Sequence, residues 1–235
     1  MSALKNLVDL NFKSLFPSPF AFANFGESSK QLNKELIRDI DEEMLFHGGE
    51  TKKKASFSLN EYGWQSRSGL ENSYDSFKEL SIAVTKCLSP MMTQSGIQEE
   101  YASRLKAAGL WATVIFGAGG FAEPHIHGSG ETLWTGVYYP AGTKTEDTLD
   151  NFDINKHILG ETTQGSGNLV LKDPAHIQKR MVQAPYKHRR YYGASVTVVP
   201  RESLLVLFPT WIEHYVQPVT DKTKRYSISF CVNKG

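Results

Sequence analysis

The hydrophobic positions in the first part of the chain recur at helical spacing. Between residues 28 and 46 they lie three or four residues apart, at Leu32, Leu36, Ile37, Ile40 and Met44. Apolar side chains at this spacing share one face of a helix. Serine is a favoured N-cap residue, so Ser28 or Ser29 is expected to begin this helix. The pattern therefore predicts a helix over residues 28–46 with one face buried.

Two further segments show the same periodicity. One runs from Phe77 to Leu88 and stops before Pro90, and the other runs from Tyr101 to Ala108 and stops before Gly109. Proline and glycine commonly follow the last turn of a helix. We therefore expect residues 1–110 to be mainly helical.

From residue 111 onward the pattern changes to short apolar runs bounded by Gly, Pro, Asn and Asp, which are typical of antiparallel strands. The runs are 111–116, 132–139, 168–171, 195–199, 204–208 and 225–232. We predict a mainly β fold with α-helices, a double-stranded β-helix of the jelly-roll or cupin-like kind. Residues 111–235 would form its core and residues 1–110 would support it. A barrel of this length commonly forms one domain, so we expect a single domain over residues 1–235.

Composition and charge narrow the classes of partner and compartment. The 26 basic and 25 acidic residues give a net charge of +1, which indicates neither a nucleic acid nor an anionic membrane as partner. Cys87 and Cys231 stand far apart without metal-binding spacing, as expected of reduced thiols. No apolar stretch approaches the roughly 18 residues of a membrane span, and no secretory signal is evident. We therefore predict a cytoplasmic protein.

Two features of the chain bear on its partners. The apolar face of the helical first part could serve a homodimer. The basic segment 179–190 has two interpretations, a lid that favours an anionic substrate or a solvated loop. With nucleic acids and membranes set aside, the expected partner is a small molecule or an amino-acid or peptide side chain.

Two histidines separated by one residue are the strongest chemical signal. In an extended strand the side chains of His125 and His127 would project to the same face. His214 follows an apolar run, 205–208, that predicts a buried strand. Burying neighbouring imidazoles without a partner is costly, whereas three neutral imidazoles suit iron, zinc, copper or nickel. The pattern favours a metal site made by these three. No such motif includes the other histidines, which are His47, His157, His176 and His188.

Several short motifs occur in a set order along the chain. They are Leu15–Pro19, Gly63–Ser66, His125–His127, Thr135–Tyr139, Asp173–Pro174, Phe208–Trp211 and Arg225–Phe230. In this order and spacing the chain resembles a bacterial and phage family of Fe(II)- and 2-oxoglutarate-dependent oxygenases, from about residue 15 to residue 233. Oxygenases of this kind usually hold the metal with a carboxylate where this chain has His127. The resemblance implies a three-histidine site, and Glu131 is a candidate substitute carboxylate.

The resemblance also implies a co-substrate site. Arg225 follows His214 by eleven residues, the position whose guanidinium would bind the distal carboxylate of 2-oxoglutarate. A planar guanidinium pairs bidentately with a carboxylate, which supports this assignment. Ser227 faces the same way and could add a hydroxyl donor, and Trp134 and Tyr139 are candidates to contact the oxoacid.

The implied reaction is that of an Fe(II)- and 2-oxoglutarate-dependent dioxygenase. With dioxygen it would hydroxylate an unactivated C–H bond of a small molecule or of an amino-acid or peptide side chain, and release succinate and CO2. The protein's share of such chemistry is to position the substrate beside the cofactor.

A second interpretation comes from another class of protein. The run from Gly119 through His125 and His127 to Glu131, followed by His214, also matches the metal-binding motifs of cupins. A cupin would use Glu131 as a fourth ligand and would give no role to Arg225. It could be an oxoacid-independent dioxygenase, an isomerase or a binding module.

Overall fold

The computed structural model describes residues 18–47, 60–117, 119–127, 132–143, 158–160, 166–175, 195–220 and 222–234. Its helical segments are η1 (Gly26–Ser29), α1 (Lys30–His47), η2 (Leu70–Asn72), α2 (Asp75–Gln94) and α3 (Glu99–Ala102). Its strands are β1 (Ala21–Asn24), β2 (Asn60–Glu61), β3 (Gly63–Gln65), β4 (Leu105–Ile115), β5 (Phe121–His125), β6 (Trp134–Tyr139), β7 (Ile158–Gly160), β8 (Leu169–Lys172), β9 (Ser195–Val198), β10 (Leu204–Pro209), β11 (His214–Val216) and β12 (Arg225–Lys234).

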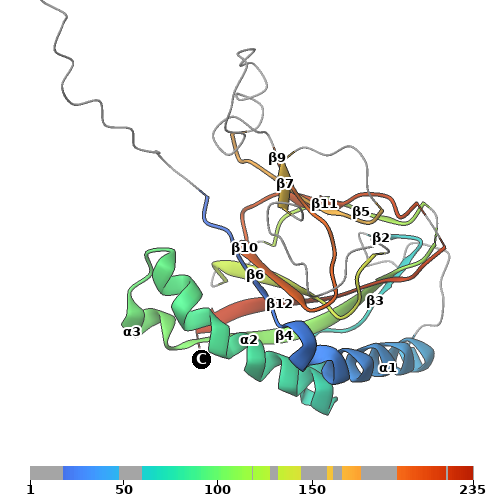
Figure 1. Ribbon diagram of the computed structural model, residues 1–235, viewed down its shortest axis with the longest axis horizontal. Coiled ribbons are helices and arrows are strands. Elements are labelled where there is room, and N and C mark those ends of the chain that lie inside the picture. Colours follow the sequence, from blue (N-terminus) through green and yellow to red (C-terminus); the bar gives the residue numbers. More distant parts are fainter. Residues whose placement is uncertain are drawn as a thin grey trace, which may run out of the picture.

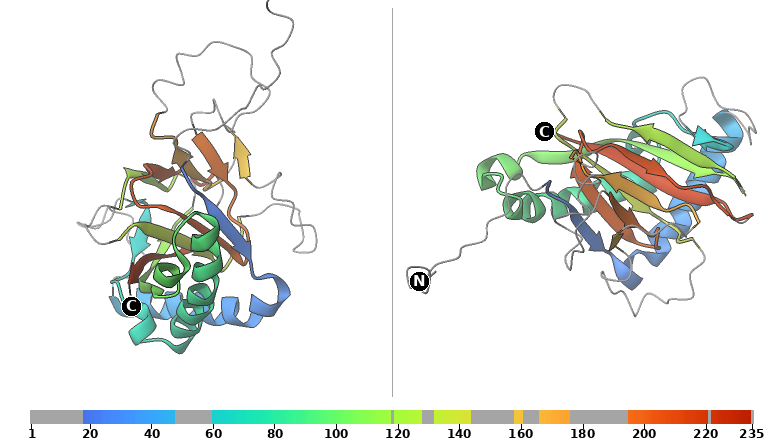
Figure 2. Two further views of the ribbon diagram at one scale, coloured as in Figure 1. Left: turned by 90° about the vertical axis from the view of Figure 1, so that its left-hand side faces the viewer. Right: turned by 90° about the horizontal axis from the view of Figure 1, so that it is seen from above.

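The strands form two antiparallel sheets. The first has the order β1-β10-β6-β12-β4-β3, and the second has the order β2-β5-β11-β8-β9-β7. Figures 1 and 2 show the two sheets facing each other, with α1 and α2 on the outer side of the first sheet. This arrangement confirms the predicted double-stranded β-helix supported by helices from the first part of the chain. None of the helices in the described ranges is long and apolar enough to cross a membrane.

Strand β6 lies in the middle of the first sheet and is buried on both faces. Trp134 and Tyr138 belong to the apolar cluster that the sheet forms with the helices. Val137 and Tyr139 belong to a second cluster, between the two sheets. Side chains alternate in direction along a strand, so residues of odd number in β6 face the second sheet. This alternation decides which residues of β6 can reach a site between the sheets.

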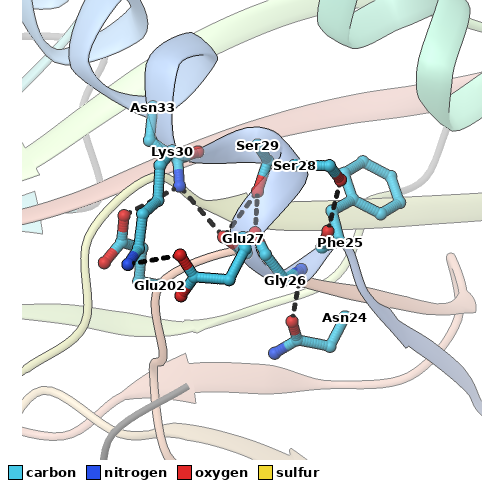
Figure 3. Close-up of polar contacts among 10 residues, drawn as sticks. Asn24, Phe25, Gly26, Glu27, Ser28, Ser29, Lys30, Asn33 and Glu202 are labelled. Carbon is cyan, nitrogen blue, oxygen red and sulfur yellow. Dashed lines mark hydrogen bonds and ion pairs between the residues drawn. The ribbon is translucent and has the colours of Figure 1, made fainter. Parts of the chain in front are cut away.

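Helix α1 begins differently from the sequence-based expectation. The 3-10 turn η1 leads directly into it, and neither Ser28 nor Ser29 acts as an N-cap. The Ser28 hydroxyl donates to the carbonyl oxygen of Phe25 and the Ser29 hydroxyl to that of Gly26, each at 2.8 Å (Figure 3). Ser29 Oγ also lies 2.6 Å from Ser203 Oγ. The serine hydroxyls thus tie this turn together and attach it to the segment before β10.

Two other helix predictions need correction. Residues 105–108 were expected to be helical, but they form the start of β4. There Leu105 pairs with Lys234 and Ala107 with Val232, so the partner strand β12 outweighs the local helical pattern. Helix α2 continues past Pro90 to Gln94. Strands β1 and β3, both within the segment expected to be mainly helical, complete the edges of the first sheet.

Gly136 is a position where the close packing of β6 can be tested. A Cβ atom there would lie 2.2 Å from Cζ of Phe230 and 2.9 Å from Cδ2 of Leu207, and both neighbours are fully buried. We expect Gly136→Ala to lower the free energy of unfolding by about 1–3 kcal/mol, the usual effect of overpacking. Urea denaturation measures this change. If the contact with Phe230 is the cause, the double variant Gly136→Ala with Phe230→Leu should lose less free energy of unfolding than the two single variants lose in sum.

Candidate metal centre

Two neighbouring strands place two of the predicted histidines side by side. His214, at the start of β11, is the register partner of His125, at the end of β5. Nδ1 of His125 lies 2.7 Å from the carbonyl oxygen of Glu123, and Nδ1 of His214 lies 2.9 Å from that of Ile212. Each Nδ1–H therefore donates to a carbonyl two residues earlier, which leaves a lone pair on Nε2. Histidines that bind metals are commonly oriented by such a hydrogen bond.

The third histidine joins this pair from just beyond the end of β5. The backbone N–H of His127 donates to the carbonyl oxygen of Thr210 at 3.1 Å, which continues the extended path of the strand. Its ring stacks on that of His214, with centroids 5.0 Å apart and planes at 17°. The Nε2 atoms of these two rings are 3.2 Å apart.

The spacing of the three rings fits one metal ion. Their ligand nitrogens all lie within 4.8 Å of one another. Two nitrogens bound at right angles to an ion at about 2.1 Å would be about 3.0 Å apart, close to the observed separation of His127 and His214. His47, by contrast, is near Glu43 on α1, with Nε2 3.9 Å from a carboxylate oxygen. His157, His176 and His188 lie outside the described residues.

Burial keeps two of the rings neutral. Together with the smaller effect of charge on His125, it lowers the pKa of His214 to about 3 and that of His127 to about 4. Only a neutral imidazole offers a lone pair to a metal ion. At neutral pH protons would therefore not compete for these two rings.

The histidines open into a cavity of about 270 Å3 between the two sheets. The first sheet supplies residues from β3, β4, β6, β10 and β12, and the second sheet supplies His125, His214 and apolar residues of β5, β8 and β11, with His127 just beyond β5. The described lining residues that bear on the chemistry are Gln65, Trp111, Thr113, Val137, Tyr139, Leu169, Phe208, Arg225, Ser227 and Ser229. Among the described residues of this lining, Arg225 is the only one with a permanent charge.

Arg225 is buried, with 4% of its surface exposed. Its Nε donates to the carbonyl oxygen of Gly167 at 2.7 Å, Nη1 to Ser227 Oγ at 3.0 Å, and Nη2 to the Tyr139 hydroxyl at 3.3 Å. No carboxylate of the described residues pairs with it, and burial lowers its pKa. Arginine nevertheless stays protonated in proteins, so this is a buried positive charge without a counterion among the described residues. A buried charge is costly unless an anion joins it.

The structure brings most of the predicted site residues together. Ser227 and Tyr139 lie beside Arg225, as the alternation of side chains along β12 and β6 requires. Trp134 does not reach the cavity, because its position in β6 directs it to the helix side, where it packs in the apolar cluster with α2. Glu131 and the basic segment 179–190 lie outside the described residues.

Sequence reasoning gave no site role to several residues that the structure places here. Trp111 and Phe208 pack against the histidines, with ring centroids 5.6 Å from His127 and 4.8 Å from His214 respectively. Gln65 belongs to the motif Gly63–Ser66, so the motif itself was a usable signal. Gly167 has a φ of +66°, and a Cβ atom on it would lie 2.8 Å from Cδ of Arg225. No local sequence pattern predicts such a close approach of Gly167 to Arg225.

Fold and site together define a double-stranded β-helix protein with a three-histidine centre and a buried arginine in one cavity. Residues 109–231, just over half of the chain, match the family described as "Putative 2OG-Fe(II) oxygenase". The chain belongs to this family, and it is a 2-oxoglutarate-dependent non-haem iron oxygenase. Fe(II) and 2-oxoglutarate are the cofactor and co-substrate that the family and the histidine triad imply. No curated protein matches the chain in sequence.

Solved structures share the fold at low sequence identity. A prolyl-4-hydroxylase from Pseudomonas putida aligns with a TM-score of 0.55 and 11% identity, over 93% of this chain and 94% of that one. A prolyl hydroxylase from Trichoplax adhaerens, solved with a hypoxia inducible factor peptide, aligns with a TM-score of 0.53 and 16% identity, over 92% of this chain and 84% of that one. The epimerase SnoN, solved with Fe3+, alpha ketoglutarate and nogalamycin RO, aligns with a TM-score of 0.54 and 11% identity, over 92% of this chain and 79% of that one. These likenesses show the fold alone, since hydroxylases and an epimerase share it.

The geometry predicts one divalent metal ion per chain, bound by the three histidines. Replacing His125, His127 or His214 singly with alanine should weaken binding by more than about 100-fold, since losing even the hydrogen-bond partner of a ligand costs about 10–100-fold. Anaerobic titration with Fe(II), followed by calorimetry, measures this. His47→Ala is the matched control and should bind as the wild type does. Equal weakening in that variant would argue against the assigned ligands.

Proposed function

We propose that this oxygenase hydroxylates an unactivated C–H bond of a small molecule or of an amino-acid or peptide side chain, with release of succinate and CO2. The observation that carries the proposal is the environment of Arg225. A buried guanidinium, without a carboxylate partner in the part of the chain that the structure describes, lines the same cavity as three histidines suited to one metal ion. A dicarboxylate that both chelates the metal and neutralises this charge fits that combination.

Six polar side chains of the cavity would then hold the cofactor or co-substrate. His125, His127 and His214 would hold Fe(II) through Nε2. With 2-oxoglutarate and dioxygen, the bound iron would supply the oxidising power for attack on a C–H bond. Arg225 would bind the distal carboxylate of the co-substrate. The hydroxyls of Ser227 and Tyr139 accept hydrogen bonds from the guanidinium; the Ser227 hydroxyl donates to the carbonyl oxygen of Thr113 at 3.5 Å, and the Tyr139 hydroxyl could donate to the same carboxylate.

The rest of the cavity bears on the group that reacts. Beyond Arg225 the described lining is uncharged, with apolar walls from both sheets such as Val137, Leu169 and Phe208. Apolar walls exclude water and offer no partner to a second charge. We therefore propose that the part of the primary substrate that enters the cavity is uncharged, consistent with attack on an aliphatic C–H bond.

The cupin interpretation is less well supported. It needs Glu131 as a metal ligand and leaves Arg225 without a role, whereas the burial of Arg225 beside Ser227 and Tyr139 calls for an anionic ligand. Membership of the oxygenase family favours the same conclusion. Glu131→Ala separates the two interpretations, since only a cupin site would lose metal affinity.

Binding of 2-oxoglutarate should depend on Arg225. Anaerobic titration of the Fe(II)-loaded protein should produce the weak visible charge-transfer band of an iron–oxoacid chelate. Arg225→Ala should raise the dissociation constant for 2-oxoglutarate by more than about 100-fold, because breaking a buried charge pair costs about 3–5 kcal/mol. Arg38→Ala, which changes an exposed arginine on α1, is the control and should leave the band unchanged. Equal affinity in the wild type and Arg225→Ala would exclude the assigned role.

The hydroxyl of Tyr139 should contribute less than the guanidinium. Tyr139→Phe keeps the ring beneath Arg225, whose Cζ lies 5.2 Å from its centroid, and removes one hydrogen-bonding group. We expect the affinity for 2-oxoglutarate to fall by about 10-fold, the effect of one hydrogen bond to a charged group. The same titration measures it. An effect as large as that of Arg225→Ala would show that the hydroxyl, and not only the guanidinium, is essential to the site.

A further inference from the structure

The three histidines of the candidate centre are not held in the same way. His125 and His214 each donate Nδ1–H to the backbone carbonyl two residues earlier in the chain. Within the part of the chain that the structure describes, the polar contact of the His127 ring is between its Nε2 and that of His214. Its Nδ1 makes no hydrogen bond to any residue that the structure describes. The orientation of the His127 ring therefore depends on packing.

Trp111 supplies that packing from the opposite sheet. It lies on β4 of the first sheet, where its register partner is Ser229 of β12. Its indole is half-buried, lines the cavity, and lies 5.6 Å from the His127 ring with the planes at 44°. The His127 ring thus contacts both the indole and the stacked ring of His214. Among the ring contacts of the described residues, Trp111 is the residue outside the triad whose ring contacts that of His127.

We propose that Trp111 is a positioning residue for His127, acting through packing in place of the hydrogen bond that orients the other two histidines. This inference rests on the proposed function, because it takes the triad to be the iron site. The proposal concerns only His127, which occupies the position where related oxygenases usually have a carboxylate. A carboxylate has a short side chain with two equivalent oxygens, whereas an imidazole must direct one nitrogen at the metal. A histidine at this position therefore requires neighbouring residues that fix the orientation of its ring.

The physical expectation follows from rotamer freedom. His127 lies beyond the end of β5, so its side chain is not confined by strand neighbours on both sides. Without the indole its ring could leave the orientation that directs Nε2 toward the other two rings. Loss of an orienting contact typically weakens metal binding by about 10–100-fold. A phenylalanine at position 111 keeps a flat aromatic face and should retain most of the effect.

The test is a titration with Co(II), which reports ligand number through its visible absorption. The variants are Trp111→Ala, Trp111→Phe and His127→Ala, with Trp211→Ala as control because Trp211 is 51% exposed. We expect Trp111→Ala to weaken Co(II) binding by about 10-fold or more and to shift the absorption toward that of His127→Ala. Trp111→Phe and Trp211→Ala should stay close to the wild type. Circular dichroism checks the fold, and Trp111→Leu replaces Trp111→Ala if the alanine variant does not fold.

Each outcome has a distinct meaning. If the wild type binds Co(II) and Trp111→Ala binds it with equal affinity and the same absorption, the positioning role is wrong while the proposed function stands. If His127→Ala binds as the wild type does, His127 is not a ligand and the inference fails with it. A wild type that binds no Co(II) would instead overturn the proposed function. Intrinsic fluorescence adds an independent readout, since Co(II) should quench the indole of Trp111 and Trp111→Phe should lose that quenching.

Discussion

The pairing of β5 with β11 is the constraint on which the site depends. His125 and His214 are direct partners across these two strands, and each ring is oriented by the backbone carbonyl two residues earlier. Side-chain direction alternates along a strand, so a shift of one residue in either strand would direct that histidine out of the cavity. The metal centre is therefore specified by backbone register before any ligand is present, and the apolar residues of β8 and β11 that stabilise the register also stabilise the site.

The two sheets contribute different chemistry to one cavity. The second sheet and the residues just after β5 carry the histidines, two of which burial keeps neutral, and the first sheet carries Arg225, which is charged and has no described carboxylate to oppose it. A chelated divalent ion would add more positive charge, so the whole cavity favours anions over cations. A three-histidine centre strengthens this bias, because it lacks the negative ligand of a two-histidine, one-carboxylate site. The electrostatics of the cavity are thus matched to a dianionic co-substrate and leave the remaining walls for an uncharged group.

The sequence predicted the parts of the site that depend on strand alternation and motif order. His125 with His127, and Arg225 with Ser227, are pairs two residues apart, and the structure brings each pair to one side. Trp134 was misassigned because an aromatic residue next to the motif Thr135–Tyr139 gives no indication of the side of the strand on which it lies. Even-numbered residues of β6 face the helices. The helix predicted over residues 101–108 failed at residues 105–108, because the apolar spacing there also fits a strand and pairing with the distant β12 favours the strand. The contacts of Gly167 and Trp111 could not be foreseen, since they join segments far apart in the chain.

Tyr138 and Tyr139 are consecutive residues that serve opposite sides of the molecule. The Tyr138 hydroxyl donates to Asn33 of α1 at 2.6 Å, within the polar cluster that fastens the start of that helix, while Tyr139 supports Arg225. One short stretch of backbone is therefore shared by the helix interface and the co-substrate pocket. Substitutions that repack the helical layer would therefore also shift Tyr139, which lines the pocket. Engineering this protein for greater stability from its helical side would, for that reason, also alter how it recognises its co-substrate.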